Sequence, residues 1–149
     1  MQQNKIKSLV SLGKILSDEN NETWQAIKNR AERNNRWFTQ KFINFAVESI
    51  VENYLNEEKL NNFLTNYNLS IVDTTRSVGL ILAGNIPLVG FHDVLCCFVL
   101  GLPTKIKLSS KDEFLIKYVI HFNRINNFFF LNFFTVDIKK AVFKHFWKL

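Results

Sequence analysis

Two short polar segments, residues 83–87 and 107–112, contain the side chains whose types and spacing could do chemistry. Asn85 in the first segment offers an amide donor. In the second segment, Lys107 offers a positive charge and Ser110 offers a hydroxyl. Each segment joins a predicted strand to the start of a predicted helix, a position that favours anions. Together the two segments predict a site for a phosphate-bearing cofactor beside a polar donor.

The glycine of the first segment, Gly84, predicts that a ligand can approach the backbone closely there. The surrounding residues match neither the G-x-G-x-x-G pattern of dinucleotide-binding loops nor a Walker A loop. A second interpretation is that Asn85 is a turn residue in a strained conformation. Likewise, Lys107 can be read as the solvated end of a strand. Both interpretations fit the sequence.

The elements around these segments are predicted to form a parallel βαβ unit. Residues 78–83 are a short continuous apolar run, which is typical of a buried strand in a parallel sheet. A helix is expected from Pro87 to about residue 100, where Gly101 ends it. Residues 104–108 predict the second strand, and Ser110 begins a capping box that opens another helix. Ligands of open parallel sheets bind beyond the carboxyl ends of the strands, where both polar segments lie.

The first 77 residues are predicted to be helical, because their apolar residues recur at helical spacing. Thr23 and Thr39 are expected to cap the second and third helices. The expected helices cover residues 6–16, 24–33, 40–55 and 56–67. The predicted fold class is therefore α/β, with an N-terminal helical segment followed by a parallel βαβ (Rossmann-like) unit.

The formal charge of +6 over 149 residues invites a nucleic-acid function. Residues 1–104 carry equal numbers of basic and acidic side chains, so the whole excess lies in residues 105–149. There the lysines are spread among Phe, Ile and Val rather than gathered on a polar face. The pattern therefore favours an ordinary globular protein over a nucleic-acid binder.

Cysteine and histidine spacing predicts no metal site. Cys96 and Cys97 are adjacent in an apolar run, which is typical of reduced core residues, and the three histidines share no ligand spacing. No apolar run is long enough to span a membrane, and residues 1–12 lack the apolar core of a secretory signal. Reduced thiols without a signal sequence favour the cytoplasm.

The stretch 78–112, which reads VGLILAGNIPLVGFHDVLCCFVLGLPTKIKLSSKD, resembles the LuxC-type acyl-CoA reductases of the aldehyde dehydrogenase superfamily. The helical residues before it also resemble that family's N-terminal region, so the likeness covers roughly residues 1–122. The resemblance implies an aldehyde dehydrogenase-like cofactor domain, NADPH as the cofactor and an acyl-CoA or another activated acyl group as the substrate. It also implies a fatty aldehyde as the product.

The resemblance assigns roles to single residues. Asn85 matches the family's Asn-x-Pro motif and would donate its side-chain amide to the thioester oxyanion. Lys107 would contact the adenosine ribose region of the cofactor, which would lie along Ala83 and Gly84. Ser110 stands where many NAD-preferring relatives have an acid, and an acid would repel a 2′-phosphate, so Ser110 favours NADPH.

Two features of the family are missing from this sequence. The nucleophilic cysteine of a separate catalytic domain is absent, because Cys96 and Cys97 lie in the predicted helix after Asn85. The second phosphate loop of the family is absent too. The expectation is an N-terminal fragment of such a reductase, inactive alone. The alternative is a non-catalytic interaction module or a degenerate remnant.

Three regions are expected: a helical region 1–77, a cofactor-binding part 78–122 and a basic, Phe-rich tail 123–149. The tail contains no family motif beyond about residue 128, and our hypothesis is that a frameshift or gene interruption replaced the family sequence there. In the alternative interpretation, the apolar tail docks onto another subunit or onto a second copy of the chain.

Overall fold

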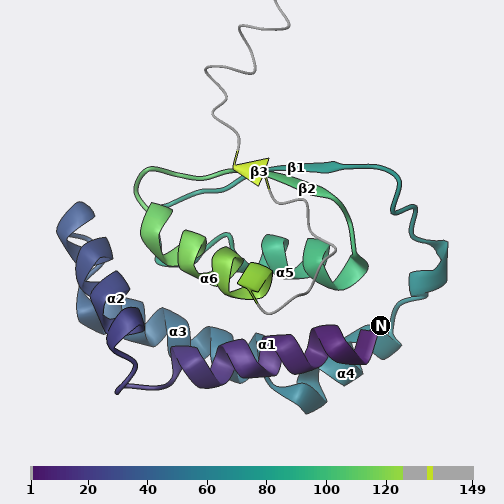
Figure 1. Ribbon diagram of the computed structural model, residues 1–149, viewed down its shortest axis with the longest axis horizontal. Helices are drawn as coiled ribbons and strands as arrows, with labels where there is room; N and C mark the ends of the chain where they lie inside the picture. Colours follow the sequence, from purple (N-terminus) through teal and green to yellow (C-terminus); the bar gives the residue numbers. More distant parts are fainter. Residues whose placement is uncertain (1, 126–133, 136–149) are drawn as a thin grey trace, which may run out of the picture.

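A computed structural model describes residues 2–125 and 134–135 and arranges them in three layers (Figure 1). A small parallel sheet forms one outer layer, and helices α5 (Phe91–Leu100) and α6 (Glu113–Ile125) lie beneath it. The other outer layer contains α1 (Gln2–Leu16), α3 (Gln40–Tyr54) and α4 (Glu57–Thr65), with α2 (Glu22–Asn34) beside it. The described chain is mixed α/β and mostly helical.

The helices of the first 77 residues lie close to their predicted ranges because asparagine and threonine caps begin them. The Thr39 hydroxyl accepts a hydrogen bond from the Phe42 amide at 3.3 Å and begins α3, as predicted. The prediction for Thr23 is wrong. The Asn21 side chain accepts from the Trp24 amide at 2.9 Å, so α2 begins one residue before Thr23.

The strand–helix–strand order of the second half is as predicted. Strand β1 (Val78–Ile81) pairs in parallel with β2 (Thr104–Lys107), and α5 connects them. A third, two-residue strand, β3 (Phe134–Thr135), pairs in parallel with β2. Gly101 ends α5 in the left-handed region at φ 73°, the conformation that favours glycine there.

Two details of this half differ from the sequence prediction. Helix α5 begins at Phe91, because residues 85–90 form turns in which Leu88 takes a left-handed φ of 57°. Strand β1 is not buried on both faces: Ile81 is 79% exposed and Leu80 is half-buried. The physical reason is that, in the described part of the chain, helices cover only one face of the sheet (Figure 1).

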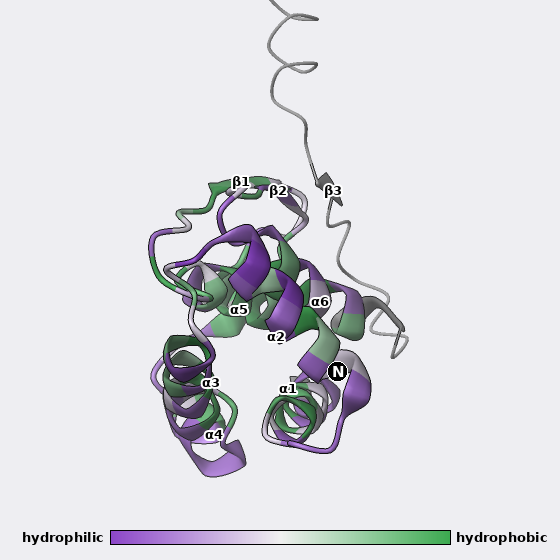
Figure 2. Cartoon of the chain, turned by 90° about the vertical axis from the view of Figure 1, so that its left-hand side faces the viewer, coloured by the Kyte–Doolittle hydropathy of each residue, from purple (hydrophilic) through white to green (hydrophobic). Residues whose placement is uncertain are grey.

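One hydrophobic core joins the helical half to the α/β half. Trp24 is 1% exposed, and its ring stacks on that of Tyr118 with centroids 5.1 Å apart. The Trp24 indole also donates a hydrogen bond to the carbonyl of Leu16 at 3.0 Å, so one side chain connects α1, α2 and α6. Figure 2 shows α5 as mostly hydrophobic, which suits its place between the sheet and the lower helices.

The tail 123–149 lies mostly outside the described residues, and so do the hypotheses of a frameshift and of docking through it. Within the described ranges, every helix is too short or too polar to cross a bilayer.

Candidate functional site

The two polar segments meet at the carboxyl ends of β1 and β2. Parallel pairing places Ile81 opposite Lys107, and the amide of Leu82 donates a hydrogen bond to the Lys107 carbonyl at 3.0 Å. The loop after β1, residues 82–90, therefore starts beside the loop after β2, residues 108–112. The sequence argument about strand ends predicted this meeting correctly.

Gly84 brings the two loops into direct contact. A Cβ atom at this position would lie 2.6 Å from the Cβ of Ser109 and 3.2 Å from the amide nitrogen of Asp112. Real side chains do not approach so closely, so Gly84 is needed for the loops to pack against each other. The close approach at Gly84 in this structure is therefore to the second loop.

Asp112, in the second loop, accepts a hydrogen bond from the backbone of the first loop. Its carboxylate Oδ2 accepts a hydrogen bond from the Leu88 amide at 2.6 Å, and only 3% of the residue is exposed. Its Oδ1 is buried and has no partner among the described residues. Burial raises the pKa of Asp112 to about 7, against the smaller opposing effect of the hydrogen bond from Leu88.

Sequence reasoning gave Asp112 no role of its own. The sequence places Asp112 at the end of the second polar segment, directly before Glu113 in the first turn of α6. No sequence signal indicates that its carboxyl is buried, because that burial comes from contact between loops 24 residues apart. One interpretation of the sequence put a strained turn at Asn85, but the left-handed backbone of the first loop is at Leu88.

Asn85 and Ala83 lie exposed on the first loop. The Asn85 side chain makes no hydrogen bond to another described residue, so its amide is not used to close the turn. Lys107 is half-buried at the end of β2, and its ammonium donates to the neighbouring Leu108 carbonyl at 2.9 Å. Both side chains keep donor capacity for a ligand.

The second loop is fixed by the end of α2. The Asn34 amide donates to the Ser110 carbonyl at 2.9 Å, and the Asn35 amide donates to the Lys111 carbonyl at 3.4 Å. The side chain of Ser110 stays exposed and does not form the predicted capping box. Instead the Ser109 hydroxyl accepts from the Lys111 amide at 3.3 Å, and α6 begins only at Glu113.

The cysteines lie away from these loops. Cys97 is buried and Cys96 half-buried, both thiols are free, and burial raises both pKa values. A raised pKa opposes thiolate formation, so neither thiol is prepared as a nucleophile. Among the described residues, no group of three or more potential ligand side chains is placed to hold a metal ion.

The residues at the strand ends fit an anionic cofactor. Lys107 and Lys111 supply positive charge beside the exposed Ser110 hydroxyl. Of the two acids that follow, Asp112 is buried and Glu113 pairs with Lys117. Asn85 lies on the adjoining loop as a neutral amide donor. The arrangement can bind phosphate and offer one further hydrogen bond to a reacting carbonyl oxygen.

Comparison of the chain with protein-family models, with curated proteins and with solved structures found no match. The functional argument therefore depends on the residues and their geometry.

Proposed function

We propose that this chain is the N-terminal, cofactor-binding part of an NADPH-dependent acyl-CoA reductase that converts an activated acyl group to a fatty aldehyde. The single observation that carries the proposal is the meeting of the Asn85 loop with the Lys107–Ser110 loop at the carboxyl edge of a parallel strand pair. The Rossmann-like character of this unit and its aldehyde dehydrogenase-like fold belong to the same proposal.

Each polar residue has a defined task in this function. Lys107, with Lys111 beside it in the loop, attracts the phosphate-bearing ribose of the cofactor, and Ser110 donates a hydrogen bond without repelling a 2′-phosphate. The cofactor would run along the first loop past the exposed Ala83, while the buried Gly84 lets this loop pack on the second one. Asn85 donates its amide to the thioester oxygen as negative charge develops on it. NADPH, when bound, supplies the hydride.

The cofactor preference tests these assignments. We expect NADPH to bind more tightly than NADH, and Ser110→Glu to reverse the order because a carboxylate repels the 2′-phosphate. Ser109→Glu is not a suitable control, because Ser109 contacts Gly84. Lys7→Glu, on the exposed surface of α1 in the opposite layer, changes the charge more strongly but away from the loop and should keep the preference for NADPH.

The absence of a nucleophile gives a second test. Because both cysteines lie in α5, the purified chain should bind NADPH but should not oxidise it in the presence of an acyl-CoA. Robust acyl-CoA-dependent oxidation by this chain would contradict the proposed division of roles.

A non-catalytic interaction module is the second candidate function. The observation that favours it is a group of exposed aromatic side chains near the start of α3: Trp37 is 84% exposed, Phe42 59% and Phe45 69%. Exposed aromatics of this kind mark protein contact sites. This candidate predicts no NADPH binding and concentration-dependent self-association that Phe45→Ser weakens.

A further inference from the structure

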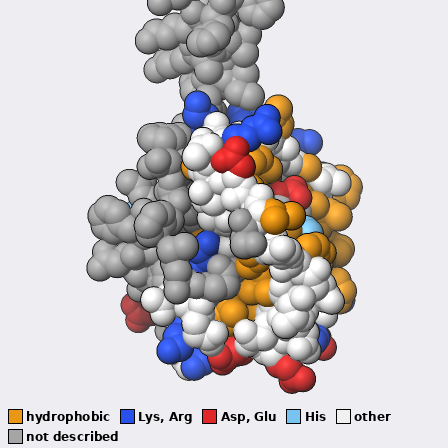
Figure 3. Space-filling model, turned by 90° about the vertical axis from the view of Figure 1, so that its right-hand side faces the viewer, with side chains coloured by type: hydrophobic (Ala, Val, Ile, Leu, Met, Phe, Trp, Pro, Cys, Tyr) orange, Lys and Arg blue, Asp and Glu red, His pale blue; other side chains and the backbone are white. Residues whose placement is uncertain are grey.

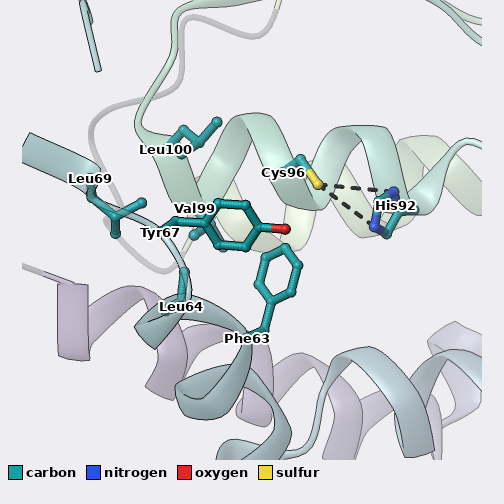
Figure 4. Close-up of a pocket in the computed structure, with 8 residues that line it drawn as sticks. All are labelled: Phe63, Leu64, Tyr67, Leu69, His92, Cys96, Val99 and Leu100. Atoms are coloured by element: carbon teal, nitrogen blue, oxygen red, sulfur yellow. Dashed lines mark hydrogen bonds between the residues drawn. The ribbon is translucent and has the colours of Figure 1, made fainter. Parts of the chain in front are cut away.

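A cavity of about 290 Å³ opens between α5 and the segment formed by α4 and the short 3-10 helix η1 (Leu69–Ile71) (Figure 4). Its walls are mostly apolar. From α4 and the residues after it come Phe63, Leu64, Tyr67 and Leu69; α5 provides His92, Cys96, Val99 and Leu100.

The α5 wall is one face of a helix, because its residues follow one another at intervals of four, three and one. None of these residues belongs to the loops after β1 and β2, so the cavity is a different site from the cofactor loops. Figure 3 shows that hydrophobic side chains gather beside a histidine on this side of the molecule.

Polar groups are confined to one end of the cavity. The Cys96 sulfur lies 3.8 Å from Nε2 and 3.9 Å from Nδ1 of His92, and in Figure 4 the Tyr67 hydroxyl points toward this pair. Leu69 and Leu100 form the opposite, apolar end (Figure 4). The cavity thus offers an apolar body with hydrogen-bonding groups at a single end.

Aromatic rings line or adjoin the cavity. The rings of Phe63 and Tyr67 lie 5.0 Å apart at 52°, the tilted geometry that aromatic side chains prefer. His92 itself packs against Tyr54 with ring centroids 5.4 Å apart, so the imidazole at the polar end has an aromatic neighbour. A flat ring entering between α4 and α5 would meet aromatic faces, sulfur and a hydrogen-bonding imidazole.

We propose that this cavity binds a small aromatic ligand that carries one hydroxyl group, with its ring between Phe63 and Cys96 and its hydroxyl at His92. The volume is at the lower end of the range of ligand pockets, which suits a single substituted ring. The proposal concerns a second site and does not depend on the cofactor-binding function.

The test uses 4-propylphenol as the probe and the reactivity of Cys96 as the readout. At a concentration about ten times its Kd, the probe should slow alkylation of Cys96 by N-ethylmaleimide about tenfold in the full chain. Propylbenzene, which lacks the hydroxyl, should bind more weakly, and 1-octanol, which lacks the ring, should protect least. Failure of 4-propylphenol to protect Cys96, or equal protection by 1-octanol, would overturn the proposal.

Two variants locate the binding. Leu100→Trp fills the apolar end and should weaken 4-propylphenol at least tenfold, whereas Ile81→Trp, on the exposed strand β1, should not. His92→Phe keeps a ring but removes the hydrogen bond, and it should abolish the advantage of 4-propylphenol over propylbenzene. Because His92 is exposed, His92→Phe should fold, so the binding site can still be tested if Leu100→Trp does not fold. Unchanged 4-propylphenol binding in both Leu100→Trp and His92→Phe would refute the site. NADPH binding does not bear on this test, because the proposed cofactor loops lie elsewhere.

Discussion

Asp112 connects the two candidate loops through one oxygen of a buried carboxyl group. Its Oδ2 accepts from the Leu88 amide while its Oδ1 has no described partner, so the charged form is poorly compensated. Leu88 also has a left-handed φ of 57°, which costs about 1–2 kcal/mol for a residue with a side chain. The hydrogen bond from Leu88 to Asp112 offsets part of that strain and keeps the Asn85 loop in place.

The raised pKa of Asp112 makes the stability of the fold depend on pH. An ordinary Asp carboxyl has a pKa of about 3.9, whereas that of Asp112 is about 7. Between these values the folded chain keeps a proton that the unfolded chain has released. The free energy of unfolding therefore falls as pH rises through this range, by up to about 1.4 kcal/mol per pH unit, and the effect is constant above the folded pKa.

Asp112→Asn removes this titration while its amide oxygen can still accept from Leu88. We expect the variant to gain stability relative to the wild type as pH rises from about 4 to about 7, with no further gain above that range. Urea unfolding of both proteins across this range measures the difference. Parallel stability curves for the two proteins would show that the pKa of Asp112 is the same in the folded and unfolded states, which would contradict the raised pKa.

Gly84→Ala tests the contact between the loops. The new Cβ would lie 2.6 Å from the Cβ of Ser109, so the loops must separate, at a cost of about 1–3 kcal/mol. Gly79→Ala is the matched control, because beyond its two chain neighbours no atom lies within 4 Å of its new Cβ, and it should change stability by less than about 0.5 kcal/mol. Equal effects of the two substitutions on thermal unfolding would contradict the contact.

At the scale of the elements, hydrophobic spacing and cap residues predicted the helices well. The helix α3 begins at its predicted cap, Thr39, and both strands pair in parallel as the apolar runs indicated. The start of α5 was missed by four residues because the pattern favoured Pro87 as a first-turn residue. In the structure, the Asp112 carboxyl and the left-handed Leu88 hold residues 85–90 in turns instead.

The candidate site was predictable only in part. Asn85, Lys107 and Ser110 could be singled out because loops after parallel strands meet at one edge of a sheet. The partners that organise these loops could not be predicted, because they come from distant contacts: Asn34 on the Ser110 carbonyl and Asp112 on the Leu88 amide. The one-sided burial of β1 was missed because the placement of helices on only one face of the sheet also depends on distant contacts.

The cap of α2 provides a prediction at this scale. Asn21→Ala removes the hydrogen bond that the Trp24 amide donates and should cost about 1 kcal/mol of stability. Thr23→Ala, two residues later and inside the helix, removes no cap and should stay within about 0.5 kcal/mol. Chemical unfolding of the two variants decides between Asn21 and Thr23 as the residue that begins the helix.

At the scale of the whole molecule, the helical layer and the α/β layer share one core. Trp24 is the clearest link, because it stacks on Tyr118 of α6 and donates to the Leu16 carbonyl at the end of α1. Lys5 of α1 also donates to the Val99 carbonyl of α5 at 2.9 Å. The described residues should therefore unfold together rather than layer by layer.

Trp24→Phe tests this coupling. It leaves the buried carbonyl of Leu16 without its donor, which should cost about 1–3 kcal/mol. We expect far-UV circular dichroism and amide exchange of the β1–β2 pair to report the same lowered midpoint. A lower midpoint for the helices alone, with the strand pair unchanged, would mean that the layers are independent.

The central claim is that the loops at the ends of β1 and β2 bind NADPH, and a fluorescence titration with NADPH tests it most directly. Wild-type chain should bind saturably. Lys107→Ala should weaken binding by about tenfold or more, since it removes a charged donor at the cofactor. Lys105→Ala removes the same charge two residues earlier on β2 and should bind like the wild type. No saturable binding by the wild type, or equal affinity of Lys107→Ala and the wild type, would contradict the claim.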